Sequence, residues 1–166
     1  FGRLTAELAA YEHVVLLDYS RSLLAEARAH LGDGRYTYVA ADVYRMPFRP
    51  GSFDGATMIR VIHHIADVPL ALQAIRRALA PGAIFILEYA NKRNLKAMLR
   101  YALRRQAWNP YSPEPTEFVP LNFDFHPAYM LDAMQAAGFR VERRLAVSLF
   151  RLGLLKRLVP VGVLAG

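Results

Sequence analysis

The stretch that decides the fold, residues 13–42, reads HVVLLDYSRSLLAEARAHLGDGRYTYVAAD. Its first part, His13–Leu17, is a short apolar run typical of a buried parallel strand. Ser20 is suited to cap the start of a helix, and Gly32 is suited to end it. Tyr36–Ala40 follows as a second apolar strand. The stretch therefore predicts a strand–helix–strand unit whose two strands pair in parallel.

The same alternation continues after this unit. A third strand is expected over Phe53–Ile59, after a loop at Met46–Ser52, and a fourth over Ala83–Tyr89. Between them, Asp67–Leu79 has the apolar spacing of a helix, which Pro81-Gly82 terminates. Because the strands are apolar throughout, we expect helices on both faces of the sheet. Short right-handed connections then give an α/β fold with a doubly wound, mainly parallel sheet.

The sequence pattern changes after residue 90. Asn94–Gln106 predicts a basic amphipathic helix, and Trp108–Asp124, with four prolines, predicts a long loop or lid. Pro127–Ala137 predicts a further helix, and Phe139–Val147 predicts a further strand. Near the start of the sequence, Leu4–Tyr11 is interpreted as the last part of a helix.

The composition fits a single domain over residues 1–166, since a chain of 166 residues that is 54% apolar can bury a sizeable core. Its expected parts are a cofactor-binding half (1–90), a substrate lid (91–126) and a C-terminal helix–strand part (127–166). The absence of cysteine excludes disulfides and thiolate metal sites. No signal peptide or membrane-spanning run is visible. We therefore expect a cytoplasmic protein, at most peripheral to a membrane.

The net charge of +7 is unevenly distributed. Basic groups of this kind attract phosphate, nucleic acid or anionic lipid headgroups, and a solvated helix face is the alternative interpretation. The first group contains no acid and consists of Lys92, Arg93, Lys96, Arg100, Arg104 and Arg105. The second has Glu142 as its only acid and consists of Arg140, Arg143, Arg144, Arg151, Lys156 and Arg157.

Two carboxylates come directly after the first two predicted strands. In parallel α/β sheets, ligands bind outside the carboxyl ends of the strands. Asp18 lies 16 residues after Gly2, a spacing close to that of nucleotide-binding units, and can accept hydrogen bonds from both ribose hydroxyls. Asp42 can accept from an adenine amino group while Val43 packs on the ring. The alternative for both acids is capping of a helix or turn.

The third predicted strand ends at Arg60 and Val61, whose backbone can line a bound cofactor. The neighbouring His63 and His64 suggest a metal or an acid–base site. Adjacent residues rarely bind one metal together, and no third ligand has supporting spacing. We therefore predict packed or helix-capping histidines and no metal. Asp54 opens the strand at its opposite end and is interpreted as structural.

These residues fall into six motifs that occur in a fixed order. The motifs are Asp18-Tyr19-Ser20, Ala41-Asp42-Val43, Met46-Pro47-Phe48, Ser52-Phe53-Asp54, Val61-Ile62-His63-His64 and Ala78-Leu79-Ala80-Pro81-Gly82. Together they resemble the S-adenosylmethionine (SAM)-dependent methyltransferases of the ubiquinone/menaquinone-biosynthesis type, often called type 11. The resemblance covers roughly residues 1–90 and implies a Rossmann-like fold. The family's first strand and last antiparallel strand are not evident, so we expect truncation at the N-terminus and at the C-terminus.

The resemblance also implies roles for matching residues around SAM. Gly2 would pass close to the cofactor as the last glycine of the family's loop, and Asp18 would hold the ribose hydroxyls. Tyr19, Ala41, Asp42 and Val43 would surround the adenine. Arg60 and Val61 would lie near the methionine part.

Methyl transfer from a sulfonium requires alignment of the reacting atoms and exclusion of water, so a conspicuous catalytic motif is not needed. His126 and Tyr89 are candidates for proton transfer, although His126 also suits a helix start. Aromatic residues of the lid can enclose an apolar acceptor or simply pack the lid onto the sheet. The acceptor-side candidates are Glu88, Tyr89, Asn91, Asn94, Trp108, Tyr111, Phe118, Phe123, Phe125 and His126.

The leading interpretation is methyl transfer from SAM to a small-molecule acceptor, lipid or aromatic. An NAD-dependent oxidoreductase is the alternative, since an acid on the ribose serves NAD equally. A non-catalytic module with a basic RNA-binding or protein-binding face is a further alternative. The basic helix, with Leu95, Met98, Leu99 and Leu103, can rest on an anionic membrane surface and admit a lipid. We do not expect nucleic acid as a partner, because no separate stacking platform is visible. The oligomeric state is left open.

Overall fold

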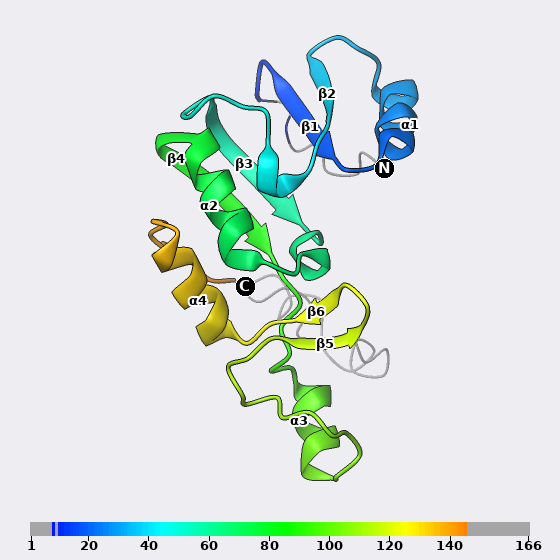
Figure 1. Ribbon diagram of the computed structural model, residues 1–166, viewed down its shortest axis with the longest axis vertical. Coiled ribbons are helices and arrows are strands. Elements are labelled where there is room, and N and C mark those ends of the chain that lie inside the picture. The colour runs from blue at the N-terminus through cyan, green and yellow to red at the C-terminus, as the bar shows by residue number, and fades with distance from the viewer. Residues whose placement is uncertain (1–7, 9, 146–166) are drawn as a thin grey trace, which may run out of the picture.

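The structure is a computed structural model that describes residue 8 and residues 10–145. Gly2 lies outside the described residues, as do most of the predicted helix Leu4–Tyr11 and the end of the predicted strand Phe139–Val147. The described part is an α/β fold with parallel strand pairs (Figure 1).

The first unit forms as the sequence predicts. Strand β1 (Val14–Asp18) leads into helix α1 (Arg21–Leu31) and strand β2 (Tyr36–Ala40). The strands pair in parallel over their whole length, and α1 packs on both of them. The hydroxyl of Ser20 accepts the Leu23 N–H at 3.3 Å. That cap satisfies one of the unpaired donors at the start of the helix.

The second unit differs from the prediction at one boundary. Strand β3 (Phe53–Ile59) is followed by helix α2 (Val68–Ala78), and strand β4 (Leu79–Glu88) begins immediately after it. The predicted break at Pro81-Gly82 was therefore placed too late. Leu79 is buried and pairs with Phe53, which draws the chain into extended conformation before the proline. The register then shifts between Phe53 and Gly55.

The two parallel pairs are not hydrogen-bonded to each other in the described part of the chain. The hydroxyl oxygen of Tyr11, just before β1, lies 3.7 Å from the position that a Cβ on Gly55 of β3 would occupy. This contact brings the chain just before β1 close to β3. The sequence predicts a sheet that lacks the family's first strand.

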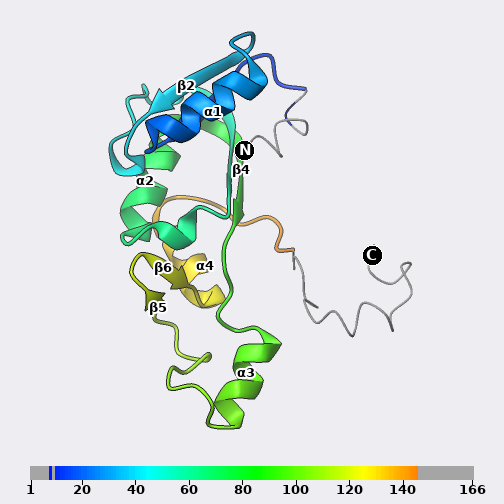
Figure 2. The same ribbon diagram turned by 90° about the vertical axis from the view of Figure 1, so that its right-hand side faces the viewer.

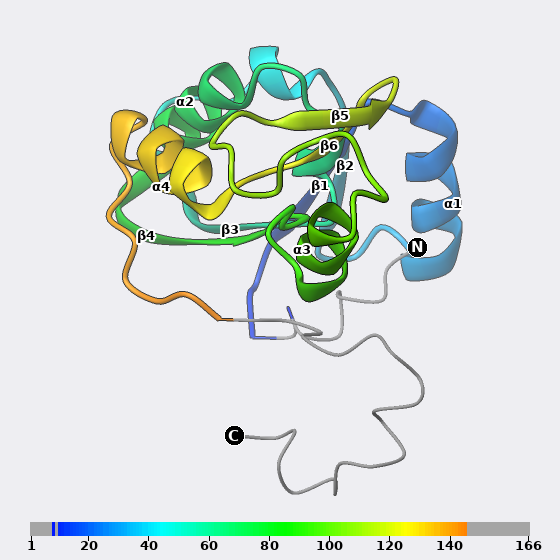
Figure 3. The same ribbon diagram turned by 90° about the horizontal axis from the view of Figure 1, so that it is seen from below.

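After β4 come helix α3 (Leu95–Ala102), strands β5 (Thr116–Val119) and β6 (Asn122–Asp124), and helix α4 (Pro127–Ala136). The view from the side places α3 at one end of the described molecule, beyond the hairpin (Figure 2). Seen from below, α3 and the hairpin lie in front of the strands (Figure 3).

Two predictions for this region were wrong. The stretch Trp108–Asp124 was expected to be a long loop or lid, but β5 and β6 form an antiparallel hairpin within it. Its turn is made possible by Leu121, whose φ of 56° lies in the left-handed region that an L side chain seldom adopts. Residues 139–145 form no strand, and the ring of Phe139 packs on Phe85 at 5.3 Å instead.

The main core lies between α2, α4 and the short 3₁₀ helix η3 (Ile62–His64). Phe125 connects this core to the end of the sheet. Its N–H donates to the Ala90 carbonyl at 2.8 Å, and its carbonyl accepts the Lys92 N–H at 3.0 Å. The lid segment is therefore joined by backbone hydrogen bonds to the chain that leaves β4. No described helix is long and apolar enough to cross a membrane.

Candidate functional site

The carboxyl ends of the strands are the place where a ligand is expected in a parallel α/β sheet. Asp18 ends β1 opposite Ala40, the last residue of β2, and Ile59 ends β3 opposite Glu88 of β4. The arrows of β3 and β4 in Figure 1 point toward the hairpin and α3. The predicted cofactor residues that are described therefore follow strand ends, and the predicted acceptor residues lie beyond them.

Asp18 shows the capping role, one of the two roles considered for it. One carboxylate oxygen accepts the Ser20 N–H at 2.8 Å and so supports the start of α1. The other has no partner among the described residues, and the side chain is half-buried. The capping interpretation is correct for one oxygen, and the second oxygen remains able to accept from a ligand.

A backbone hydrogen bond holds the residue before Asp42 against Asp18. The N–H of Ala41 donates to the Asp18 carbonyl at 3.1 Å, which extends the β1–β2 pairing to the acidic residue. The Asp42 carboxylate accepts the Tyr44 N–H at 2.9 Å and caps the 3₁₀ helix η2 (Val43–Arg45). The side chain is exposed and Val43 is half-buried behind it. The sheet thus brings the two acids to neighbouring strand ends.

Two apolar side chains at these strand ends are open to solvent. Tyr19 is 84% exposed, and Val61 is 47% exposed. An exposed aromatic ring next to an acceptor carboxylate, as at Tyr19 and Asp18, is suited to a ligand with a flat ring and hydroxyl groups. The contacts that the resemblance implies for Tyr19 and Val61 remain predictions.

The end of β3 carries backbone strain that the sequence did not reveal. Arg60 has a φ of 58° in the left-handed region, where an L residue with a Cβ is disfavoured by about 1–2 kcal/mol. Strained positions of this kind gather at functional sites. Glycine or asparagine would have signalled the conformation, but arginine gives no such signal.

The paired histidines pack on each other, and His64 also forms a hydrogen bond. Their rings lie 4.0 Å apart, and burial, followed by the charges of His64 and Arg60, lowers the pKa of His63. Nδ1 of His64 lies 3.0 Å from the Leu121 carbonyl, so η3 is tied to the hairpin turn. In the described residues no group of three metal-ligating side chains is assembled. The tie to the hairpin links the cofactor half to the lid.

The two proton-transfer candidates lie in different settings. Tyr89 is half-buried against the core, and burial raises the pKa of its phenol. His126 begins α4, where Nδ1 accepts the Ala128 N–H at 3.2 Å. Burial and the charges of Arg93 and Lys92 lower its pKa. The helix-start interpretation of His126 is therefore correct, and Nε2 is the nitrogen left for proton transfer.

The aromatic candidates of the lid divide into two sets. Phe125 is buried and stacks on Phe123 and Tyr129, with ring centroids 6.2 and 5.8 Å away. Phe125 therefore packs the lid onto the core and does not face an acceptor. Phe118 and Tyr111 are exposed and remain able to contact one.

The position of Lys92 differs from its prediction. It was assigned to a basic surface group, but the side chain is only 1% exposed. Its Nζ donates to the Glu114 carbonyl at 2.6 Å, and burial lowers its pKa against the raising effect of Glu114 and Asp124. A lysine between asparagine and arginine gives no signal of burial. It fastens the loop before β5 to the chain that leaves β4.

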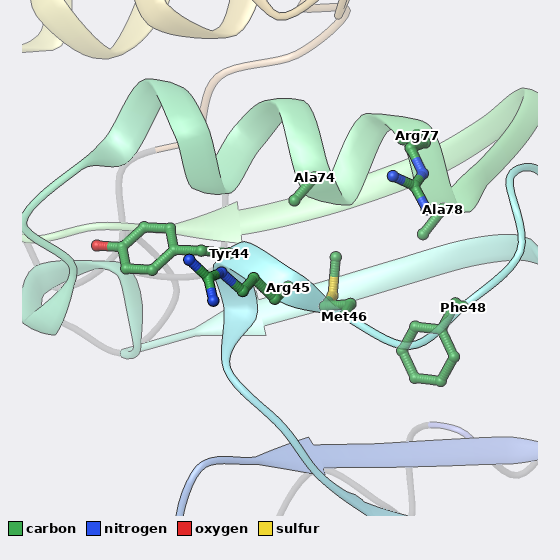
Figure 4. Close-up of a pocket in the computed structure, with 7 residues that line it drawn as sticks. All are labelled: Tyr44, Arg45, Met46, Phe48, Ala74, Arg77 and Ala78. Atoms are coloured by element: carbon green, nitrogen blue, oxygen red, sulfur yellow. The ribbon is translucent and has the colours of Figure 1, made fainter.

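Neither of the two described cavities holds the predicted cofactor residues. One of about 50 Å³ lies between α2 and the segment formed by η2 and the loop after it, as Figure 4 shows. The other, about 240 Å³, lies between α1 and β2. Small-molecule sites usually enclose about 300–1,000 Å³. The predicted cofactor residues that are described thus lie at the carboxyl ends of the strands, outside both cavities. The smaller cavity is lined by Tyr44, Arg45, Met46, Phe48, Ala74, Arg77 and Ala78.

The fold is that of SAM-dependent methyltransferases. A crystal structure of such an enzyme from Mesorhizobium loti superposes with a TM-score of 0.69 and 22% identity, over 92% of this chain and 75% of that one. A second, from Methanosarcina mazei, gives a TM-score of 0.66 and 21% identity, over 86% and 76%. The predicted Rossmann-like fold is confirmed.

The chain belongs to the methyltransferase domain family, which matches residues 1–87. The family resemblance drawn from the motifs is thereby confirmed, and S-adenosylmethionine is the cofactor of that family. The 2-phytyl-1,4-naphtoquinone methyltransferase of Nostoc punctiforme is 35% identical over 49% of this chain and 37% of its own length. The ubiquinone/menaquinone biosynthesis C-methyltransferase of Teredinibacter turnerae is 32% identical over 67% and 45%. The chain thus spans less than half of these relatives.

Proposed function

We propose that the protein binds SAM at the carboxyl ends of β1, β2 and β3 and transfers its methyl group to a quinone-type acceptor. The observation that carries the cofactor part is the pair of acids at neighbouring strand ends. Asp18 keeps an oxygen without a described partner, and Asp42 lies beside it through the Ala41–Asp18 hydrogen bond of 3.1 Å. Such acceptors suit the hydroxyl and amino groups of an adenosine.

The residues present fit the cofactor in chemistry. SAM supplies an electrophilic methyl group on a sulfonium, whose departure leaves a neutral thioether. Asp18 would hold the ribose, and Asp42, Ala41 and Val43 would meet the adenine, with Tyr19 beside it. The strained backbone at Arg60 and the exposed Val61 would border the methionine part.

The acceptor class rests on the relatives. Those with matching sequence include methyltransferases named for a phytyl-naphthoquinone and for ubiquinone and menaquinone biosynthesis. A flat ring with an apolar chain would suit the exposed aromatics Tyr111 and Phe118 beyond the end of β4. Tyr89 and the free Nε2 of His126 are the groups able to move a proton if the acceptor must lose one.

The proposal is tested by calorimetric titration of S-adenosylhomocysteine into the full-length protein. We expect micromolar binding that Asp18→Ala and Asp42→Ala each weaken about tenfold or more, which is about 1.4 kcal/mol. Asp54→Ala is the matched control, because Asp54 is an exposed acid at the opposite end of β3. It should leave binding unchanged.

The alternatives appear as other outcomes of the same titration. If the folded protein binds NAD but not S-adenosylhomocysteine, the oxidoreductase interpretation is the better one. If the folded protein binds neither ligand, the interpretation as a non-catalytic module is favoured. Equal losses from Asp18→Ala and from the Asp54→Ala control would show that the strand-end acids are not the binding groups.

A further inference from the structure

Helix α3 is the element least covered by the rest of the described chain. No described helix or strand packs extensively against it, and Figures 1 and 2 show it at one end of the molecule. Ala97 is its one buried residue. Most of the remaining side chains of the helix are exposed.

The apolar side chains of α3 face outward. Leu95, Leu99 and Leu103 follow one another at four-residue spacing, which aligns them on one side of a helix. They are 56, 58 and 55% exposed. A helix of a water-soluble domain normally turns such a row toward the core. Here the row points away from it.

Basic side chains lie beside this apolar row. Lys96 and Arg100 each follow one of the leucines, and Arg104 and Arg105 come at the end of the helix. All four are exposed. The described ion pairs lie elsewhere in the molecule, so no described carboxylate neutralises these cations. The exposed surface combines an apolar face with unneutralised positive charge.

The segment that carries this surface, residues 93–114 (the α3 lobe), is held in place at its base. Buried Lys92 donates to the Glu114 carbonyl at 2.6 Å and closes the two ends of the lobe. Tyr111 returns to the helix, with its ring 6.3 Å from Tyr101 and under the guanidinium of Arg93 at 5.9 Å. The returning loop thus packs on α3 while the leucine row stays exposed.

We propose that the α3 lobe docks on the surface of an anionic lipid membrane. The leucine row would enter the boundary between headgroups and acyl chains. The cations beside it would meet the lipid phosphates and carboxylates. Interfacial helices bind through this pairing of buried apolar area and attraction to anionic lipids.

Charge complementarity and the leucine row together favour lipid over RNA as the partner. An RNA strand would neutralise the cations, but it would leave the leucine row in water. A membrane satisfies both halves of the surface at once. The lobe also follows β4, so it lies at the carboxyl end of the sheet.

The first test is sedimentation of the full-length protein with vesicles of phosphatidylcholine mixed with phosphatidylserine. We expect binding that Lys96→Glu/Arg100→Glu/Arg104→Glu weakens by about 100-fold or more, because each basic residue near the surface contributes about fivefold. The matched control is Arg45→Glu/Arg49→Glu/Arg77→Glu, which removes as much charge from exposed positions outside the lobe. It should retain most of the binding.

A second pair of variants tests the apolar half. Leu99→Ser should weaken vesicle binding about tenfold or more, because it removes an apolar side chain that would be buried in the membrane. Leu70→Ser, at an exposed position of α2, should not weaken it. Trp108 is the one tryptophan among these 166 residues and lies in the lobe, so brominated lipids should quench its fluorescence. Circular dichroism shows whether each variant is folded.

Equal losses from the lobe and control charge variants would overturn the proposal, as would binding that prefers single-stranded RNA to vesicles. Absence of vesicle binding by the folded protein would do the same. Vesicle binding needs no cofactor, so its failure is distinguishable from a failure to bind S-adenosylhomocysteine.

Discussion

The β1–α1–β2 unit and the α3 lobe with its hairpin are built on different principles. In the first, neighbouring residues determine the structure: Ser20 caps the helix, and each strand is a short apolar run. In the second, partners distant in sequence determine it, since Lys92 reaches Glu114 and Phe125 reaches Ala90. A pattern read along the chain therefore describes the first region well and the second poorly.

The largest expected effect comes from breaking the long-range docking of the lid. Phe125→Ala removes a fully buried ring from the core between α2 and α4. We expect it to lower the free energy of unfolding by about 3–5 kcal/mol, as measured by chemical denaturation. Phe118→Ala, at an exposed position of β5, is the control and should change stability little. Similar losses for both would mean that the lid is not anchored through Phe125.

A smaller loss is expected at the base of the α3 lobe. Lys92→Ala removes buried aliphatic packing and a charge-assisted hydrogen bond, so we expect a loss of about 2–3 kcal/mol. Lys92→Met keeps the packing and should cost less. Hydrogen exchange should then quicken in residues 106–114 before it changes in α1. Unchanged protection of that loop would contradict the role of Lys92 as its fastener.

In the β1–α1–β2 unit, one hydrogen bond is expected to contribute measurably to the free energy of unfolding. Ser20→Ala removes the cap at the start of α1 and should destabilise the protein by about 1 kcal/mol. Ser20→Asp supplies another capping acceptor and is expected to restore most of that loss. If the aspartate variant is as unstable as the alanine variant, the hydroxyl acts through something other than the cap.

The same contrast explains what the sequence analysis could and could not foresee. The strand–helix order up to β4 and the placement of Asp18 and Asp42 at strand ends follow from apolar runs and their boundaries. The left-handed backbone of Arg60 and the burial of Lys92 do not, because neither residue type indicates its conformation or surroundings. The hairpin was missed because proline-rich composition predicts a loop whether or not short strands pair within it.

The candidate cofactor site was only partly predictable for a related reason. Family motifs placed its residues, and the fold brought the described ones to strand ends. Exposure of Tyr19 and Val61 depends on what covers them in three dimensions, which no local pattern encodes. The tie from His64 to the hairpin is likewise a contact across 57 residues.

The smallest effect is expected at the junction between η3 and the hairpin of the second region. Burial, with the charges of His64 and Arg60, lowers the pKa of His63, so the unfolded chain binds a proton more readily than the folded one. The stability is therefore fully present above the ordinary histidine pKa of about 6.5 and falls as the pH drops through it, until the lowered folded-state pKa is reached. Unfolding midpoints measured across this range should decline less steeply in His63→Gln. If the unfolding midpoints of the variant decline as steeply as those of the unmodified protein, groups other than His63 cause the pH dependence.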